Sequence, residues 1–481
     1  MSKYKRLFAN TIWFGISNVS SRAALFLLLP VYTSYMTDAE FGIYELTTTA
    51  IFFLIPLFTL QITNALVRFG LDSGEDIEEI FSCATIFVVA GLLLSILFYP
   101  LIGLYEPLGQ YSNYFYLLLI FRIFYTTIQS FLKTIDKVSI LSIAGLVETA
   151  AVIAFTFLLI VYYKLGLEGF FITLLISIGL ATIVILILTK PFQYFNRKKI
   201  SLSKIKEMAI FSLPLMPNSM NGWFMNLSNR YFIEYYLGVA ATGIFSIAAR
   251  IPVIFQVVYN TFYNAWIISA FENYDKHDRK YFFTTVHELL FFFFTVGISF
   301  TFIILKPVMS VLVAADFYSA WQYMPYLLVG TIFYCMTSFF GVLYIAEKKT
   351  KLVLYTTLVG SFLSVTLNII LIPYWGINGS SFSFFISFFV VWMIRVYQTN
   401  KFFPLATSYV RILISSALIM IQVWVCYNIE LNEWAFQTGI LLILLLVNIK
   451  TIKMIILHGG NLYDVLIKKR KIKLNRDMIS K

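Results

Sequence analysis

The stretch EGFFITLLISIGLATIVILILTK, from Glu168 to Lys190, decides the class of fold, because the 21 residues between its charged ends carry no charge. An α-helix needs about 20 mostly apolar residues to cross the hydrocarbon core of a bilayer, which is roughly 30 Å thick. A backbone in lipid must satisfy its own hydrogen bonds, and this run is far too long for a barrel strand. The stretch therefore predicts a membrane-spanning helix.

The rest of the chain repeats this signal. Of its 481 residues, 60% are hydrophobic and 12% are charged, whereas a soluble domain carries about 25% charged residues. We predict an all-α integral membrane protein of about fourteen transmembrane helices, the first of them retained rather than cleaved as a signal peptide. The predicted windows are 8–33, 41–66, 81–103, 112–133, 139–163, 168–190, 207–236, 240–269, 281–305, 322–346, 351–373, 377–399, 409–428 and 434–457.

Basic residues set the orientation of these helices. With the amino terminus inside, the inner segments hold 29 of the 36 Lys and Arg residues, and the outer loops hold only Lys164 and Lys306. Basic residues normally collect on the cytoplasmic side of membrane proteins. Both termini are therefore predicted to be cytoplasmic. The net charge of +12 is explained by attraction to anionic lipids of the inner leaflet and needs no nucleic acid.

A short motif recurs 201 residues apart. Residues 35–44 (YMTDAEFGIY) lie between the first two windows, and residues 236–245 (YLGVAATGIF) lie between the seventh and eighth. Two parallel halves with a binding site between them are a recurrent plan of transporters. We expect two six-helix lobes related by pseudo-symmetry. The expected division is an N-lobe at 1–206, a C-lobe at 207–402, and helices 13 and 14 with a basic cytoplasmic tail at 403–481.

Five arginines fall within the predicted spans: Arg22, Arg122, Arg230, Arg250 and Arg395. Each costs about 2.5–3.5 kcal/mol at the centre of a spanning helix. Arg395 and Arg230 lie near helix ends, where a long side chain can reach the headgroup region. The other three lie too deep for that.

Polar residues share helix faces with these arginines. We assign seven residues to a binding site. They are the arginines Arg22, Arg122, Arg230 and Arg250 and the asparagines Asn18, Asn226 and Asn260. Two interpretations are open: the polar groups bond across helices and only hold the bundle together, or they line a water-filled cavity formed largely by spans 1, 2, 7 and 8. Because arginines dominate and arginine binds phosphate in a bidentate manner, such a cavity would prefer a phosphate-containing anion.

Two further features concern movement and coupling. The seventh window contains Pro214 and Pro217, which favour a kink or an unwound turn. Intramembrane carboxylates are few, and we treat Glu148 and Glu45 as ion-coupling candidates, although Glu45 lies close to the outer surface. Glu148 is either a proton or cation site or the partner of Arg122 or another arginine.

These residues resemble a known family. Residues 29–46 (LPVYTSYMTDAEFGIYEL) and residues 64–69 (NALVRF) are similar to the junction of spans 1 and 2, and to the end of span 2, in bacterial polysaccharide-repeat flippases of the Wzx type. That family belongs to the multidrug/oligosaccharidyl-lipid/polysaccharide exporter superfamily. The resemblance also covers the span count and the basic tail.

The resemblance implies a flippase that works by alternating access. Its cargo would be an undecaprenyl-diphosphate-linked oligosaccharide, moved from the cytoplasmic to the outer leaflet of the bacterial inner membrane for O-antigen or capsule-type polysaccharide. Arg22 and Arg250 would hold the diphosphate. Candidate partners besides the substrate and anionic lipids are the polymerase and the glycosyltransferases of the same pathway.

Two other classes of function fit the sequence less well. A drug exporter of the same superfamily should present acidic groups to a cationic drug, whereas the charge at mid-membrane here is mostly basic. A membrane polysaccharide polymerase would carry a large outer loop, and the longest predicted one runs only from about Lys306 to Trp321. The three histidines and three cysteines show no ligand spacing, so the sequence predicts neither an enzyme nor a bound metal or cofactor.

Overall fold

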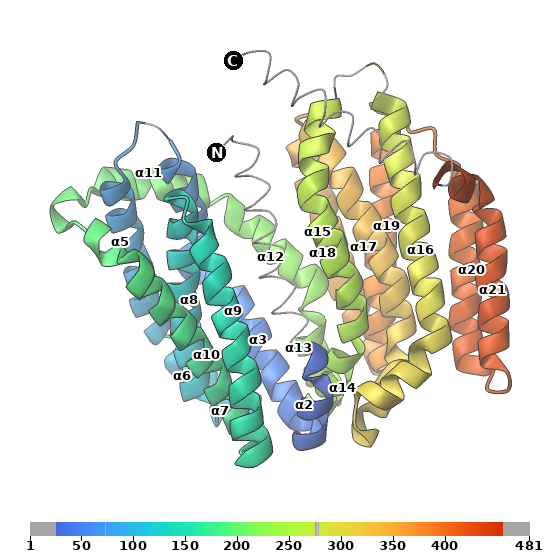
Figure 1. Ribbon diagram of the computed structural model, residues 1–481, viewed down its shortest axis with the longest axis horizontal. Helices are drawn as coiled ribbons and strands as arrows, with labels where there is room; N and C mark the ends of the chain where they lie inside the picture. The colour runs from blue at the N-terminus through green and yellow to red at the C-terminus, as the bar shows by residue number, and fades with distance from the viewer. Residues whose placement is uncertain (1–25, 73, 275–276, 278, 456–481) are drawn as a thin grey trace, which may run out of the picture. The chain divides into compact units, whose positions relative to one another are not determined.

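The computed structural model describes residues 26–72, 74–274, 277 and 279–455, and these form helices joined by short turns, with no strand among them (Figure 1). Eleven helices in these ranges are long and apolar enough to span a membrane, or twelve if a pair bent by 68° at Glu433–Val447 and Ile449–Ile455 counts as one span. The eleven are α3 (Asp38–Thr59), α5 (Ile77–Ile96), α8 (Ser112–Thr134), α9 with the π-helical turn η1 (Val138–Tyr162), α10 (Gly166–Thr189), α15 (Arg250–Asn273), α16 (Arg279–Leu312), η4 with α17 (Ala315–Ala346), α18 (Thr350–Trp375), α19 (Ile377–Asn400) and α20 (Tyr409–Asn428).

The all-α membrane fold is thus confirmed, while the count of fourteen stays a prediction. Most of the first window, 8–33, lies outside the described residues, and only its end appears, in α2 (Leu29–Tyr35). The seventh window is divided into helices too short to be counted as spans. The remaining short elements are α4 (Ile62–Gly70), α6 (Tyr99–Leu104), α7 (Glu106–Gly109), η2 (Pro191–Tyr194), η3 (Arg197–Lys199), α11 (Leu202–Ser212), α12 (Leu215–Asn226), α13 (Asn229–Leu237), α14 (Val239–Ala248) and α21 (Glu433–Val447).

The break expected in the seventh window is present. Helix α11 ends at Ser212, and α12 begins after Pro214, because proline has no backbone N–H to continue the helical hydrogen bonds. A second break, at Leu227 and Ser228, separates α12 from α13 and was not predicted. The eighth window is also interrupted, since α14 ends at Ala248 and α15 starts at Arg250.

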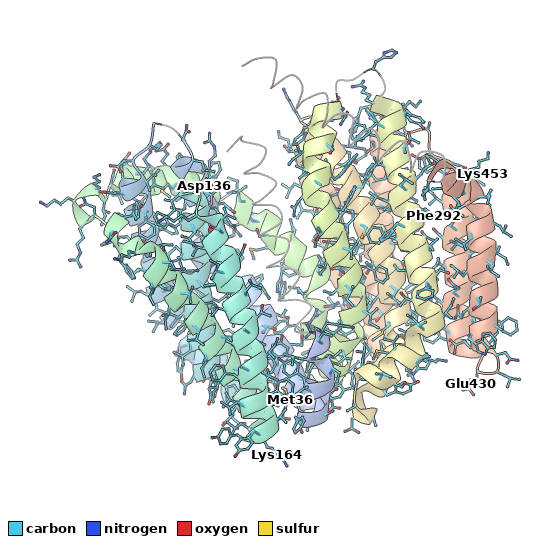
Figure 2. All side chains as sticks on the ribbon, in the orientation of Figure 1. Met36, Asp136, Lys164, Phe292, Glu430 and Lys453 are labelled. Carbon is cyan, nitrogen blue, oxygen red and sulfur yellow. The ribbon has the colours of Figure 1, made fainter. Side chains whose placement is uncertain are left out.

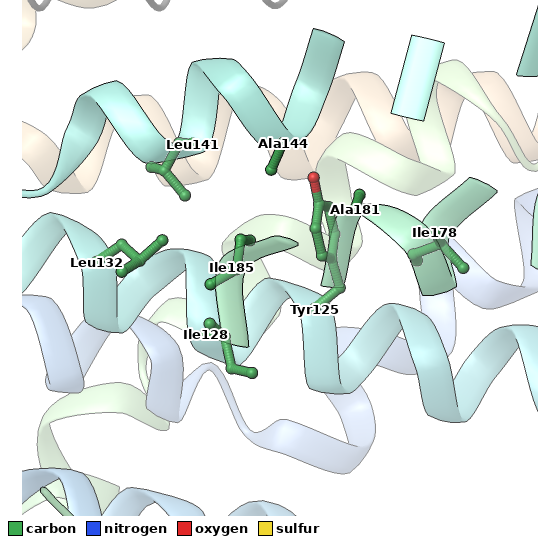
Figure 3. Packing of buried hydrophobic residues seen from close by; sticks show 8 residues of the cluster. All are labelled: Tyr125, Ile128, Leu132, Leu141, Ala144, Ile178, Ala181 and Ile185. Atoms are coloured by element: carbon green, nitrogen blue, oxygen red, sulfur yellow. The ribbon is translucent and has the colours of Figure 1, made fainter. Parts of the chain in front are cut away.

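The chain forms two compact units. Unit 1 comprises Met1–Thr261, Met309–Leu327 and Leu354–Ser387, and unit 2 comprises Phe262–Val308, Leu328–Val353 and Phe388–Lys481. In unit 1 the helices α8, α9 and α10 pack around an apolar cluster (Figure 3). Ala144 on α9 and Ala181 on α10 belong to this cluster, and their small side chains let the two helices approach closely.

The ends of unit 1 can be followed in Figure 2. Asp136, which precedes α9, lies at one end, and Met36 and Lys164 lie at the opposite end. Helix α11 lies at the Asp136 end and runs across α5, whereas α5, α8, α9 and α10 run between the ends (Figure 1). The orientation predicted from charge would make the Asp136 end the cytoplasmic one.

Unit 2 is held by polar contacts between its helices. The side-chain amides of Gln422 on α20 and Gln437 on α21 each donate to the other residue's backbone carbonyl, at 3.2 and 3.0 Å. Arg411 on α20 forms an ion pair with Glu288 on α16. Arg395 on α19 is buried and donates to the Thr337 carbonyl at 2.8 Å, so it serves packing within this unit.

Candidate functional site

One carboxylate in unit 1 binds two arginines. Glu45 on α3 accepts a hydrogen bond from Arg230 Nε on α13, with Oε2 at 3.0 Å, and its Oε1 accepts one from Nη2 of Arg250 at the start of α15. The three residues, here called the charge triad, are separated by 185 and 205 positions along the chain. They carry one net positive charge.

The members of the triad differ in accessibility. The side chains of Glu45 and Arg230 are 8% and 9% exposed, whereas that of Arg250 is 24% exposed. The Nε of Arg250 is buried and has no hydrogen-bond partner within the described part of the chain. Arg250 is therefore the most exposed member of the triad, although its unused Nε donor is buried.

The repeated motif of the sequence explains how Glu45 is held. Thr37 caps α3, with its hydroxyl accepting from the Glu40 N–H and the Glu40 carboxylate accepting from the Thr37 N–H at 2.8 Å. This reciprocal capping box fixes the first turn of the helix. The second carboxylate oxygen of Glu40 accepts from the Leu167 N–H at 3.3 Å, which ties α3 to the start of α10.

The two glycines of the repeat meet where α3 crosses α14. A Cβ on Gly42 would lie 2.1 Å from the Val239 carbonyl oxygen, and a Cβ on Gly243 would lie 1.9 Å from the Asp38 carbonyl oxygen. Asp38 and Val239 are related by the same offset of 201 residues as the two glycines, so the contact is reciprocal. Only glycine permits this approach, which places Glu45, one turn after Gly42, beside the arginines.

The two arginines are supported by aromatic rings, and Arg230 also by a neighbouring side-chain amide. The Arg230 guanidinium lies 5.8 Å from the ring centre of Phe245, and that of Arg250 lies 5.5 Å from the ring centre of Phe41. A guanidinium over an aromatic face is attracted by the electron-rich ring. Arg230 Nη1 also donates to Asn229 Oδ1 at 3.4 Å, so its position is fixed from several sides.

A small cavity of about 70 Å³ lies next to Arg230 within unit 1. Polar side chains contribute to its lining together with aromatic rings. These are Asn226, Asn229, Arg230 and Gln256, with Phe245 and Phe384. Amide groups beside rings suit hydroxyl and amide groups of a bound molecule.

Arg122 and Glu148 form an ion pair of their own. Arg122 Nη1 on α8 lies 3.3 Å from Glu148 Oε1 on α9, and the side chains are 32% and 20% exposed. This is the ion-pair alternative for Glu148 among the two left open by the sequence. Both side chains remain partly exposed.

The other predicted site residues divide into three cases. Asn226 lies one turn before Arg230 and lines the cavity. Asn260 lies ten residues beyond Arg250 on α15, about 15 Å along the helix axis, so it is not brought to the triad. Arg22 and Asn18 lie outside the described residues.

Several residues near the triad were not singled out from the sequence. The Tyr231 hydroxyl donates to the Leu46 carbonyl at 2.9 Å, and the Trp223 indole donates to the Thr49 carbonyl at 2.9 Å, joining α13 and α12 to α3. Phe41 and Phe245, under the guanidinium groups, belong to the repeated motif. Their position in that motif was the available signal.

The fold and the candidate spans define a multi-pass membrane protein. Residues 7–271, more than half of the chain, match the sequence profile of the family described as "Polysaccharide biosynthesis protein". The chain belongs to this family. None of the curated proteins matches the chain in sequence.

Solved structures show the same fold. A lipid II flippase MurJ in an inward closed conformation is similar, with a TM-score of 0.69 and 15% identity, over 95% of this chain and 100% of that chain. An inward-facing multidrug resistance MATE transporter of the MOP superfamily gives 0.68 and 13%, over 84% and 95%. A MOP superfamily transporter from Pyrococcus furiosus gives 0.58 and 13%, over 88% and 96%. At such identities the likeness concerns the fold alone.

Proposed function

We propose that this protein is a flippase for a lipid-linked oligosaccharide carried on undecaprenyl diphosphate. It would move the repeat unit from the cytoplasmic to the outer leaflet of a bacterial inner membrane by alternating access, for the biosynthesis of a surface polysaccharide such as O-antigen or capsule. Membership of the polysaccharide biosynthesis family and the transporter fold support this function.

The observation that carries the proposal is the charge triad. One arginine is enough to neutralise Glu45, so the triad keeps one positive charge at a largely buried position. This charge costs free energy unless an anion binds to it. Arg250 is the most exposed member of the triad, and a guanidinium can bind phosphate oxygens through charge-assisted hydrogen bonds. Arg22, Arg122, Asn18 and Asn260 remain proposed contacts along the route of the substrate.

In the proposed cycle the diphosphate replaces Glu45 as the partner of Arg250. Glu45 keeps Arg230 in place and takes Arg250 back when the substrate leaves. The cavity beside Arg230, with Asn226 in its lining, would accept a polar group of the first sugar. The breaks on either side of α12 would let that segment bend as access changes.

The test measures binding and export separately. Purified protein in nanodiscs is titrated with undecaprenyl diphosphate bearing one sugar, and Arg250→Ala and Arg230→Ala are compared with the unmodified chain. Loss of one charge-assisted hydrogen bond costs about 1.5–3 kcal/mol, so the affinity should fall by roughly 10- to 100-fold. In cells lacking the native gene, both variants should fail to restore surface polysaccharide while their amounts in the membrane stay normal.

Arg68→Ala is the matched control, because Arg68 pairs with Asp72 at an exposed position outside the triad. It should bind the lipid and export polysaccharide normally. Unchanged binding and export in Arg250→Ala would refute the proposal. Efflux of a cationic dye that depends on Glu45 would instead favour the drug-exporter alternative.

A further inference from the structure

Acidic residues in the first turn of α5 and in the loop before it meet basic residues that precede α12, at the Asp136 end of unit 1. We call residues 190–212, which include η2, η3 and α11, the connector. Lys199 lies 2.6 Å from Asp76 and 3.0 Å from Glu78, and Lys204 lies 2.9 Å from Glu75. The hydrogen bond from Lys199 holds the pKa of Asp76 below its usual range, so this pair stays charged at neutral pH.

Uncharged contacts strengthen this attachment. The Asn196 N–H donates to Ser82 Oγ at 2.8 Å, and the Ser201 N–H donates to Cys83 Sγ at 3.5 Å. Met208 on α11 is fully buried. One side of the connector is therefore fastened to α5 and its preceding loop.

The remaining basic residues of the connector point to a different partner. Lys190, Arg197, Lys198 and Lys206 are exposed, and none of them has an ion-pair partner within the described ranges. The connector thus uses two lysines for its own attachment and exposes four other basic residues, and we call its exposed residues the free side. No carboxylate within the described residues pairs with these four basic side chains.

Large apolar side chains share that free side. Leu202 is 81% exposed and Ile210 is 63% exposed, and with Lys206 they follow the four-residue spacing of a single ridge on α11. Phe192 in η2 is 62% exposed, and the apolar surface continues to Leu213, which is 51% exposed. Exposure of these apolar side chains to water is unfavourable. Burial of the nearby basic side chains in hydrocarbon is equally unfavourable.

The boundary of the bilayer satisfies both requirements. A helix that lies in the plane of the interface buries its apolar side chains among acyl chains while its lysines reach phosphate headgroups. Helix α11 runs across α5 at the end of unit 1, which is the direction that such a helix requires (Figure 1). The mixture of cations and large apolar groups fits a lipid surface better than a soluble protein partner or a nucleic acid.

We propose that the free side of the connector, formed by Phe192, Arg197, Lys198, Leu202, Lys206 and Ile210, is a binding surface for the anionic lipids of one leaflet. The surface holds lipid headgroups at the point where residues 190–212 join α10 to α12. This proposal is independent of the transported substrate.

The first experiment locates the surface in the bilayer. Leu202→Cys is labelled with an environment-sensitive fluorophore in nanodiscs, which is selective because Cys83, Cys335 and Cys426 are buried. Lipids brominated on their acyl chains should quench this label strongly. A label on Gly74→Cys, in the exposed loop before α5, should not be quenched and serves as the control. Absence of quenching at residue 202 would overturn the proposal.

The second experiment measures lipid selectivity. Quenching of the residue 202 label by brominated phosphatidylglycerol is divided by quenching by brominated phosphatidylcholine in otherwise identical mixtures. Each cation near an anionic surface contributes about a fivefold preference, so the ratio should exceed one and fall toward one in the triple variant R197Q/K198Q/K206Q. High salt should have the same effect.

Lys199→Gln with Lys204→Gln is the matched variant, because it removes two cations that are already paired. Its ratio should stay close to that of the unmodified chain, although the connector is attached less firmly. Equal ratios for the unmodified chain and the triple variant, or an equal loss in both variants, would show that the unpaired cations do not bind lipid. Neither readout requires transport, so the proposed flippase activity can fail without affecting this result.

Discussion

The carboxylate of Glu45 separates two guanidinium groups that would otherwise repel each other among apolar helices. Its two oxygens serve different arginines, Arg230 through Nε and Arg250 through Nη2. Low exposure strengthens these interactions and equally raises the free energy of any member left alone. The triad is therefore a cooperative unit, and its members should respond to substitution together.

Glu45→Gln should lower the free energy of unfolding by about 3–5 kcal/mol, because it leaves two buried positive charges without a carboxylate. Adding Arg230→Gln restores the net charge of the site, so the double variant should be more stable than Glu45→Gln alone. Thermal unfolding in detergent measures the four members of this double-mutant cycle. Additive effects of the two substitutions would mean that the pair does not interact in the folded protein.

Between the two carboxylates, Glu148 is the better candidate for ion coupling, because it pairs with one arginine instead of two and is 20% exposed. Glu148→Gln cannot bind or release a proton. We expect it to remove the dependence of lipid flipping on a pH gradient across proteoliposomes while flipping without a gradient continues. Arg122→Lys keeps the charge of the pair and serves as the control. Persistence of the gradient dependence in Glu148→Gln would exclude this role.

At the scale of elements, the crossing of α3 and α14 sets the position of the triad. Backbone meets backbone there, and the contact is repeated by the two copies of one motif. Neither helix has room for a side chain at the crossing. Glu45 lies on α3, and α14 leads directly into Arg250, so a change in the crossing moves both ends of an ion pair.

Gly42→Ala and Gly243→Ala should each destabilise the protein by about 1–3 kcal/mol, because the added methyl group would force the helices apart. The double variant should lose less than the sum of the two, since the first substitution already opens the crossing. Gly103→Ala and Gly439→Ala are matched controls with open space around the added carbon. Melting temperatures measure all five variants, and equal losses in tests and controls would contradict a tight crossing.

At the scale of the whole molecule, the apolar runs and the arginines were visible in the sequence, because hydrophobic length and charge are local properties. The pairing of Glu45 was not, since its partners lie 185 and 205 residues away and its position near a predicted helix end suggested exposure. The break at Leu227 and Ser228 has no proline or glycine to signal it. The repeat was recognisable as a pattern, but its contact with its own copy depends on three-dimensional packing.

The number of spans is also a property of the whole molecule, and labelling of the intact chain from either side of the membrane measures it. The described helices supply twelve spans if the bent pair is counted, and the windows 8–33 and 207–236 would bring the total to fourteen. An even total would place both termini on one side, and the distribution of basic residues predicts that this side is the cytoplasm. Single cysteines at residues 2, 137, 164 and 480 should therefore react differently with a membrane-impermeant thiol reagent. In intact cells only residue 164 should be labelled, because Lys164 lies at the end of unit 1 opposite to Asp136 (Figure 2). All four should react after lysis, which controls for accessibility, and labelling of just one terminus in intact cells would require an odd number of spans.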